Sequence, residues 1–135
     1  MSVVIDSSIT LAWFFEDERS VAADAVLKQV VESGAVVPTL WRLEVANALQ
    51  MAIRRKRIDA AFRDATLMDL RALDIAVDAQ TDAQAWANTL GMAERFQLTL
   101  YDAAYLELAK RLGLPLATLD KELRVAAKKL GILAS

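Results

Sequence analysis

The sequence contains no histidine and no cysteine among its 135 residues. Serine–histidine triads, cysteine–histidine dyads, histidine general bases and the common zinc sites are therefore excluded, because each needs one of these residues. Carboxylates, hydroxyls, lysine, arginine and hard cations bound through oxygen remain for catalysis. The lack of cysteine also gives no sign of an oxidising compartment, so the expected location is the cytoplasm.

Glycine and proline are scarce, at 4 and 2 residues, and no linker, repeat or low-complexity segment is visible. No apolar run approaches the ~20 residues of a membrane-spanning helix, and the start MSVVID lacks the features of a signal peptide. Hydrophobic residues make up 56% and charged residues 25%, which is typical of a folded globule. The length suits one domain, and we expect residues 1–135 to form it.

Short runs of branched apolar residues alternate with longer segments of helical periodicity. This alternation predicts an α/β fold with a mainly parallel sheet covered on both faces, because parallel strands need crossover connections. The predicted strands cover residues 3–6, 35–38, 74–77, 114–118 and, as a short last strand, 132–134. The predicted helices cover residues 9–15, 17–34, 40–57, 59–73, 81–96, 99–113 and 120–131. On the helix at residues 40–57, the expected apolar face consists of Leu43, Ala46, Leu49 and Ile53.

Four acidic residues stand out by their position relative to these elements. Asp6 follows the first strand and Asp120 follows the strand at 114–118, at the edge where open α/β sheets bind ligands. Glu44 and Asp102 fall in or near the first turn of helices whose N-termini could face the same edge. In one crevice, such like charges repel strongly unless they are protonated or neutralised by a divalent cation. Carboxylate oxygen is the preferred ligand type for Mg²⁺ and Mn²⁺.

Three polar neighbours support a metal site. Ser8 offers a hydroxyl just past Asp6 that can hold a metal-bound water or a carboxylate. Asn47 lies three residues after Glu44, so it shares a helix face with this acid and could orient it. Thr118 stands two residues before the last acid, on the same side of the strand.

Each of these residues also has a purely structural interpretation. Asp6 or Asp120 can be an N-cap that accepts a hydrogen bond from an N–H of the next turn. Thr99 and Asp102 have the spacing of a capping box, and Glu44 near a helix start interacts favourably with the helix dipole. The three polar neighbours can equally be a turn serine, an exposed amide and a β-forming threonine. The residues alone leave both interpretations open.

The ordered acids with their flanking patterns resemble the PIN-domain ribonucleases, specifically VapC-like toxins of bacterial type II toxin–antitoxin pairs. The resemblance covers essentially the whole chain and rests on VVIDSSITLAW, LWRLEVANAL, LTLYDAAYLELAKRLGLPLATLDKEL and AKKLGI. It implies a PIN-like three-layer α/β/α fold with a short, mainly parallel sheet of four or five strands and about seven helices. The residues that match the family's catalytic acids are Asp6, Glu44, Asp102 and Asp120, with metal binding expected of Asp6, Asp102 and Asp120 and supporting roles of Ser8, Asn47 and Thr118.

The expected reaction is metal-dependent hydrolysis of an RNA phosphodiester. Mg²⁺, with Mn²⁺ as the alternative, would lower the pKa of a bound water and stabilise charge on the phosphate oxygens. In-line attack by water predicts products with 5′-phosphate and 3′-hydroxyl ends, as in the resembling family. The candidate RNA contacts are Arg54, Arg55, Lys56 and Arg57, although a basic run at a helix C-terminus commonly faces water. The resemblance further implies a cognate antitoxin that obstructs the cleft, a homodimer and no membrane partner.

Two rivals remain. Phosphatases and phosphoryl-accepting domains use an aspartate at the end of the first strand as nucleophile. Haloacid-dehalogenase-like phosphatases typically show a second aspartate two residues later, where this chain has Ser8, and receiver-like domains need paired acids at an earlier strand. The other rival is a PIN-like binding module without catalysis, whose acids serve only as helix caps.

Overall fold

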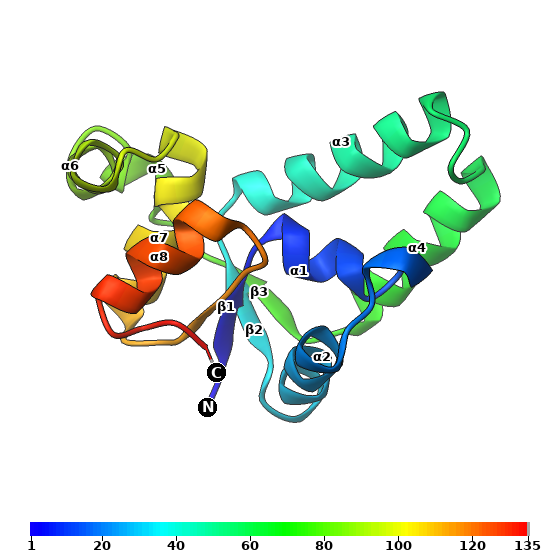
Figure 1. Cartoon of the computed structure of the whole chain (residues 1–135), viewed down its shortest axis with the longest axis horizontal. Helices are drawn as coiled ribbons and strands as arrows, with labels where there is room; N and C mark the ends of the chain where they lie inside the picture. Colours follow the sequence, from blue (N-terminus) through cyan, green and yellow to red (C-terminus); the bar gives the residue numbers. More distant parts are fainter. Residues whose placement is uncertain (135) are drawn as a thin grey trace.

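A four-stranded parallel sheet with the strand order β3-β2-β1-β4 forms the centre of the molecule (Figure 1). The computed structural model describes residues 1–134. The strands are β1 (Val3–Ile5), β2 (Ala35–Val37), β3 (Ile75–Val77) and β4 (Leu116–Ala117). The helices are α1 (Ser7–Ala12), α2 (Val21–Ser33), α3 (Leu40–Arg54), α4 (Ala60–Ala72), α5 (Thr81–Gln84), α6 (Asn88–Phe96), α7 (Leu100–Leu112) and α8 (Lys121–Lys129), with the short 3-10 helix η1 (Glu16–Glu18) after α1.

Strand β1 lies inside the sheet, between β2 and β4. Val4 pairs with Val36 on one side and with Leu116 on the other. All three residues of β1 are fully buried, as expected for a continuous apolar run in a parallel sheet. The chain reverses its direction of winding between β1 and β4, so the carboxyl ends of these two strands form the topological switch point where such sheets bind ligands.

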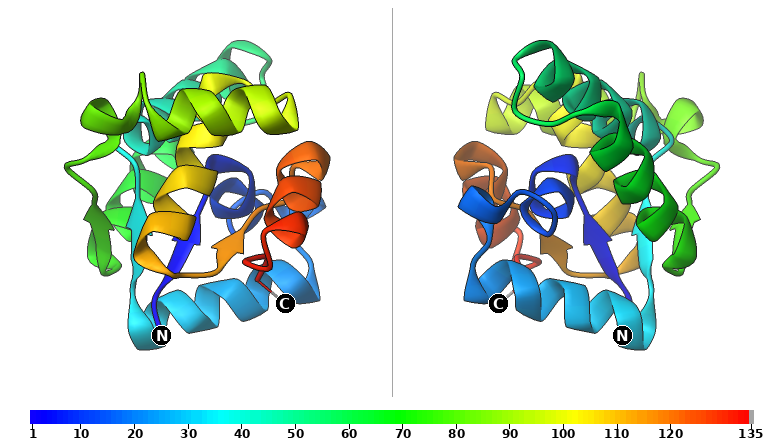
Figure 2. Two further views of the ribbon diagram at one scale, coloured as in Figure 1. Left: turned by 90° about the vertical axis from the view of Figure 1, so that its left-hand side faces the viewer. Right: turned by 90° about the vertical axis from the view of Figure 1, so that its right-hand side faces the viewer.

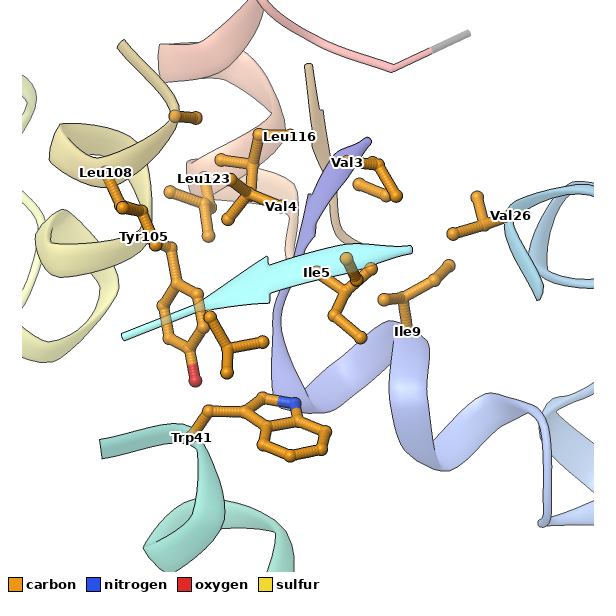
Figure 3. Close-up of a cluster of buried hydrophobic side chains, with 14 of the residues drawn as sticks. Val3, Val4, Ile5, Ile9, Val26, Trp41, Tyr105, Leu108, Leu116 and Leu123 are labelled. Atoms are coloured by element: carbon orange, nitrogen blue, oxygen red, sulfur yellow. The ribbon is translucent and has the colours of Figure 1, made fainter. Parts of the chain in front are cut away.

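Helices cover both faces of the sheet, which confirms the predicted three-layer α/β/α arrangement (Figure 2). Figure 3 shows Val26 of α2 and Leu108 of α7 approaching β1 from opposite sides, with Leu123 of α8 beside Leu116. No helix within residues 1–134 combines the length and apolar character that crossing a bilayer requires. The core therefore lies around β1, and the same packing fixes the position of the residue that follows this strand.

The element types agree with the prediction, but several boundaries differ. The helix expected at residues 17–34 begins only at Val21, because the Ser20 hydroxyl caps it by accepting a hydrogen bond from the N–H of Ala23. The helix expected at residues 81–96 is two helices, α5 and α6, since Ala87 has φ −117° and ψ −108°. Within residues 1–134 there are thus eight α-helices, and the expected last strand is reduced to one parallel bridge between Leu116 and Leu133.

The predicted apolar face of α3 was wrong except for Leu49, which is fully buried. The core side of this helix consists of Trp41, Val45, Leu49 and Ala52, whereas Leu43 is 76% exposed. Both sets of residues have helical spacing, and contact with α1 decides between them. Helices α3 and α4 form an arm that reaches away from the sheet, with its turn far from the termini (Figure 1).

Candidate active site

The carboxylate of Asp6 lies at the carboxyl end of β1 and is almost completely buried. Its Oδ1 accepts hydrogen bonds from the Ser8 hydroxyl at 2.6 Å and the Ile9 N–H at 3.0 Å, and its Oδ2 accepts one from the Thr118 hydroxyl. The bond from Ile9 makes Asp6 the N-cap of α1. Burial raises the pKa of Asp6; the three hydrogen bonds oppose this rise and the charge of Asp120 adds to it.

Two hydroxyls connect the ends of β1 and β4 through Asp6. The Ser8 oxygen accepts the N–H of Leu119 at 2.9 Å, and the Thr118 oxygen accepts the N–H of Asp120 at 3.0 Å. A hydroxyl has only one proton, and an ionised carboxylate can only accept hydrogen bonds. The proton of each hydroxyl is therefore directed at Asp6, which fixes both oxygens of this carboxylate at the switch point.

Asp102 and Asp120 stand at the starts of α7 and α8. Thr99 caps α7 by accepting the N–H of Asp102 at 3.1 Å, and Asp120 caps α8 by accepting the N–H of Leu123 at 2.9 Å. The capping role of Asp120 is thus confirmed, whereas at the start of α7 only the Thr99 half of the predicted capping box is present among the described residues. Burial raises the pKa of Asp102, and the charges of Asp120 and Asp6 raise it further. Asp120 therefore both caps a helix and belongs to one cluster of mutually repelling acids.

Glu44 lies just past the first turn of α3 and is held by Tyr105 of α7, whose hydroxyl donates a hydrogen bond to Glu44 Oε1. Burial raises the pKa of Glu44, the hydrogen bond from Tyr105 opposes the rise, and the charges of Asp102 and Asp6 add to it. Burial and the bond to Glu44 also raise the pKa of Tyr105 far above its usual value, so the phenol stays a donor. Figure 3 shows its hydroxyl oxygen directed toward the start of α3.

Tyr105 and Thr10 are two site residues that the sequence-based prediction missed. The Thr10 hydroxyl donates to the backbone carbonyl of Asp6 at 2.7 Å and accepts the indole N–H of Trp41 at 3.1 Å, which ties the start of α3 to the end of β1. Thr10 and Trp41 are 31 positions apart in the sequence, and Glu44 and Tyr105 are 61 positions apart. The available signal was the spacing of Tyr105, three residues after an acid and therefore on the same side of α7.

Asn47 and the basic run at residues 54–57 form no hydrogen bond or ion pair with this cluster among the described residues. Asn47 is exposed, and within residues 1–134 no hydrogen bond joins it to Glu44, whose orientation comes from Tyr105. The basic run is at the opposite end of α3 from Glu44, about 15 Å along the helix axis.

One member of the basic run has partners of its own. Arg57 forms ion pairs with Asp17 at 3.2 Å and with Glu18 at 3.4 Å, and its guanidinium lies 4.6 Å from the centre of the Phe15 ring. These contacts attach the turn of the α3–α4 arm to η1. Arg57 therefore has a structural role that is independent of any ligand.

The chemistry of the acidic cluster suits a hard divalent cation. Among residues 1–134, no three acidic side chains converge closely enough to enclose an ion. Mg²⁺ does not need such a cage, because it retains several waters and usually binds one or two carboxylates together with substrate phosphates. Asp102 and Asp120 are only partly buried, so they can accept such an ion from the solvent side. The residues present fit a partly hydrated cation held among carboxylates that otherwise repel each other.

The sequence profile of the PIN domain family matches residues 3–129, and the chain belongs to this family. Ribonuclease VapC3 from Pyrobaculum aerophilum is 31% identical over 123 residues, which cover 91% of this chain and 92% of the relative. The predicted resemblance to VapC-like PIN-domain proteins is therefore confirmed.

Two solved structures share the fold. PAE2754 from Pyrobaculum aerophilum has a TM-score of 0.68 at 24% identity, over 96% of this chain and 92% of that protein. Mycobacterium tuberculosis VapC20, described as a sarcin-ricin loop cleaving toxin, has a TM-score of 0.63 at 16% identity, over 93% of this chain and 95% of the toxin.

Proposed function

We propose that this protein is a divalent-metal-dependent endoribonuclease and the toxin of a toxin–antitoxin pair. The observation that carries the proposal is the set of acids at the switch point, where Asp6, Glu44 and Asp102 all have a raised pKa partly because of neighbouring carboxylates. Kinship over nine tenths of the chain with a protein named as a ribonuclease supports RNA as the substrate. We propose Mg²⁺ as the metal, with Mn²⁺ as the alternative, and the cytoplasm as the place of action.

Asp6, Asp102 and Asp120 are the proposed metal ligands, and Glu44 completes the catalytic acids. When bound, a divalent ion lowers the pKa of a water molecule and stabilises charge on the phosphate oxygens. Asp6 accepts two hydrogen bonds at Oδ1 and one at Oδ2, which leaves about one of its four acceptor positions open, on Oδ2, for a metal ion. The chain's own contribution is to fix Asp6 through two hydroxyls and Glu44 through Tyr105, so that the acids do not move apart under their mutual repulsion.

The main test replaces single acids with their amides. Asp6→Asn and Asp102→Asn are each expected to abolish RNA cleavage while circular dichroism shows an intact fold. The matched control is Asp69→Asn on the exposed side of α4, which is expected to keep wild-type activity. The products should carry 5′-phosphate and 3′-hydroxyl ends, which end-labelling distinguishes from cyclic phosphates. Full activity of both site variants in clean protein rules the scheme out.

The rivals make different predictions for Asp6. A phosphoryl-accepting enzyme forms an adduct between Asp6 and a phosphate mimic, whereas Asp6 is 5% exposed and has both oxygens engaged. A binding module whose acids are only caps shows no stabilisation by millimolar Mg²⁺ or Mn²⁺. Labelling of Asp6 without metal-dependent RNA cleavage would favour the first rival, and an unchanged melting temperature would favour the second.

The antitoxin and the homodimer belong to the same proposal. A groove of about 1210 Å³ between η1 and the turn of the α3–α4 arm is lined by apolar side chains that include Phe14, Ile58 and Phe62. This groove suits the apolar face of an amphipathic helix from the antitoxin. Phe62→Asp is expected to weaken co-purification with the cognate antitoxin, to be sought as the product of a small neighbouring gene, without reducing RNA cleavage. Light scattering of the isolated protein tests the dimer.

RNA contact by the basic run at residues 54–57 is a separate proposal. Because Arg57 is held by acidic side chains, the test uses Arg54 and Arg55. Replacing both with glutamine should flatten the salt dependence of RNA binding if they contact phosphates. An unchanged slope counts against contact at this end of α3.

A further inference from the structure

Helix α8 carries three basic side chains that form a row along one face of the helix. Lys121, Arg124 and Lys128 are three and four residues apart, which places them on one face of the helix. All three are exposed, and none forms an ion pair within residues 1–134. The row extends for about 10 Å along the helix axis.

The row begins at the edge of the acidic cluster. Lys121 directly follows Asp120, and Arg124 donates a hydrogen bond from Nη1 to the backbone carbonyl of Thr118 at 3.0 Å. The hydroxyl of the same threonine contacts Asp6, so the guanidinium of Arg124 is attached close to the buried acid. Helix α8 then runs beside α7 away from the carboxyl ends of the strands (Figure 1). Positive charge therefore starts where the acids end and continues along the surface.

Helix stability does not explain this arrangement. A helix N-terminus favours negative charge, so Lys121 at the first position of α8 is unfavourably placed with respect to the dipole. Only Lys128, in the last turn, complements the dipole. The helix dipole therefore does not account for Lys121 and Arg124.

The three side chains line a groove of about 730 Å³ between α8 and the segment at residues 131–134. Gly131 adds no side chain to its floor, and a Cβ built there would meet nothing within 4 Å. The groove is open, and its lining combines these three cations with the apolar residues Val125, Leu133 and Ala134. An open surface with cations along one helix suits an extended chain of phosphates better than a compact ligand.

We propose that Lys121, Arg124 and Lys128 bind the phosphate backbone of single-stranded RNA on one side of the bond that is cut. The inference rests on the proposed ribonuclease function and deepens it. A polyanion that approaches an acidic crevice is repelled, and a row of cations at its edge provides compensating positive potential. Contacts to phosphates position a strand without reading its sequence, so the row should strengthen the binding of all RNA sequences about equally.

The test compares two triple variants that lose the same charge. The first is Lys121→Gln, Arg124→Gln and Lys128→Gln, and the control removes three exposed cations from α2, α4 and α6 by the changes Lys28→Gln, Arg71→Gln and Arg95→Gln. Binding of a single-stranded oligoribonucleotide is followed by fluorescence anisotropy without divalent ions, from about 50 to 200 mM salt. Each phosphate contact contributes about 0.7 to the slope of log Kobs against log salt, so the α8 variant should lose about 2 and the control nothing.

Kinetics and a second ligand complete the test. In cleavage assays the α8 variant should show a raised KM with a smaller change in kcat, because uniform binding is removed. Wild-type slope and KM in this variant, in a protein that cleaves RNA, overturn the inference and leave the ribonuclease proposal standing. Absence of metal-dependent cleavage by the wild type removes the ribonuclease proposal instead. Loss of binding to a polyglutamate peptide with unchanged RNA binding would assign the groove to an acidic protein partner and overturn the inference.

A variant without the Arg124 change separates charge from folding. Lys121→Gln with Lys128→Gln leaves the hydrogen bond to the Thr118 carbonyl intact. This double variant should lose about 1.4 from the slope and melt like the wild type. An unchanged slope in a folded double variant contradicts the proposal.

Discussion

The hydrogen bond from Tyr105 to Glu44 connects α7 with α3 across the site, and Tyr105→Phe removes this bond alone. The ring, whose residue is 1% exposed, stays in the core, so no cavity larger than a hydroxyl is left. Glu44 then loses its donor in a half-buried position. Hydrogen bonds to charged groups contribute about 1.5–3 kcal/mol, so we expect the free energy of unfolding to fall by about 2 kcal/mol. For a chain of this length, that is a fall in melting temperature of about 6–8 °C.

The effect should depend on pH in a defined direction. The bond from Tyr105 lowers the pKa of Glu44, which means that it stabilises the ionised carboxylate more than the neutral acid. The decrease in the free energy of unfolding caused by Tyr105→Phe is therefore largest above the folded-state pKa of Glu44, which burial raises. This decrease becomes smaller as the pH falls through that value. Urea denaturation of wild type and variant at about pH 8 and about pH 4 measures the difference.

A double-mutant cycle identifies the partner. In a Glu44→Ala background the tyrosine hydroxyl has lost its acceptor, so Tyr105→Phe should cost much less than in the wild type. The same cost in both backgrounds would refute the reasoning, because Tyr105 would then stabilise the protein without acting through Glu44.

Three further predictions concern charge. Asp102→Asn should raise the melting temperature at neutral pH without metal. Burial and neighbouring acids raise the pKa of Asp102, so its ionised form opposes folding above its unfolded-state pKa. The gain should vanish below about pH 4, and a lower melting temperature of the variant would contradict the repulsion. Saturating Mg²⁺ or Mn²⁺ should stabilise the wild type, by about 2.7 kcal/mol at a hundredfold excess over Kd, and Asp6→Asn should remove the shift. Arg111→Met should lower the free energy of unfolding, measured with denaturant, by about 3 kcal/mol. The change leaves the carboxylates of Glu107 and Asp78 without the guanidinium that contacts them at 2.6 and 2.8 Å. Arg111 also lowers the pKa of Asp78, so wild-type stability should decline as the pH falls through that lowered value; an unchanged variant at neutral pH would contradict this role.

The alternation of strands and helices was predictable because its signals are local. The apolar run of β1 ends at an aspartate, and Gly34 and Gly113 end α2 and α7 with positive φ, a conformation in which side chains are rarely found. The four acids were also predictable as a group, because each follows a strand or opens a helix. Their convergence depended on the strand order, which no local pattern contains.

The failed predictions depend on contacts between distant segments. Helix α3 has apolar residues on two sides, and periodicity alone does not distinguish the side with Leu43 from the side with Trp41. The distinction comes from α1, where the Thr10 hydroxyl accepts the indole N–H of Trp41. The role of Tyr105 was missed, because its partner lies on another helix. Polar groups that hold the acids through contacts between distant segments are therefore difficult to recognise in the sequence.

The position of β1 between an early strand and a late one has a consequence for synthesis of the protein. A growing chain that has reached the end of α7 already contains Asp6, Glu44 and Asp102, but it lacks the Thr118 hydroxyl that fixes the first of these acids. It also lacks β4, so one edge of β1 has no partner. The complete site can therefore form only after Thr118 and β4 have also been synthesised, more than a hundred residues after the first of its acids.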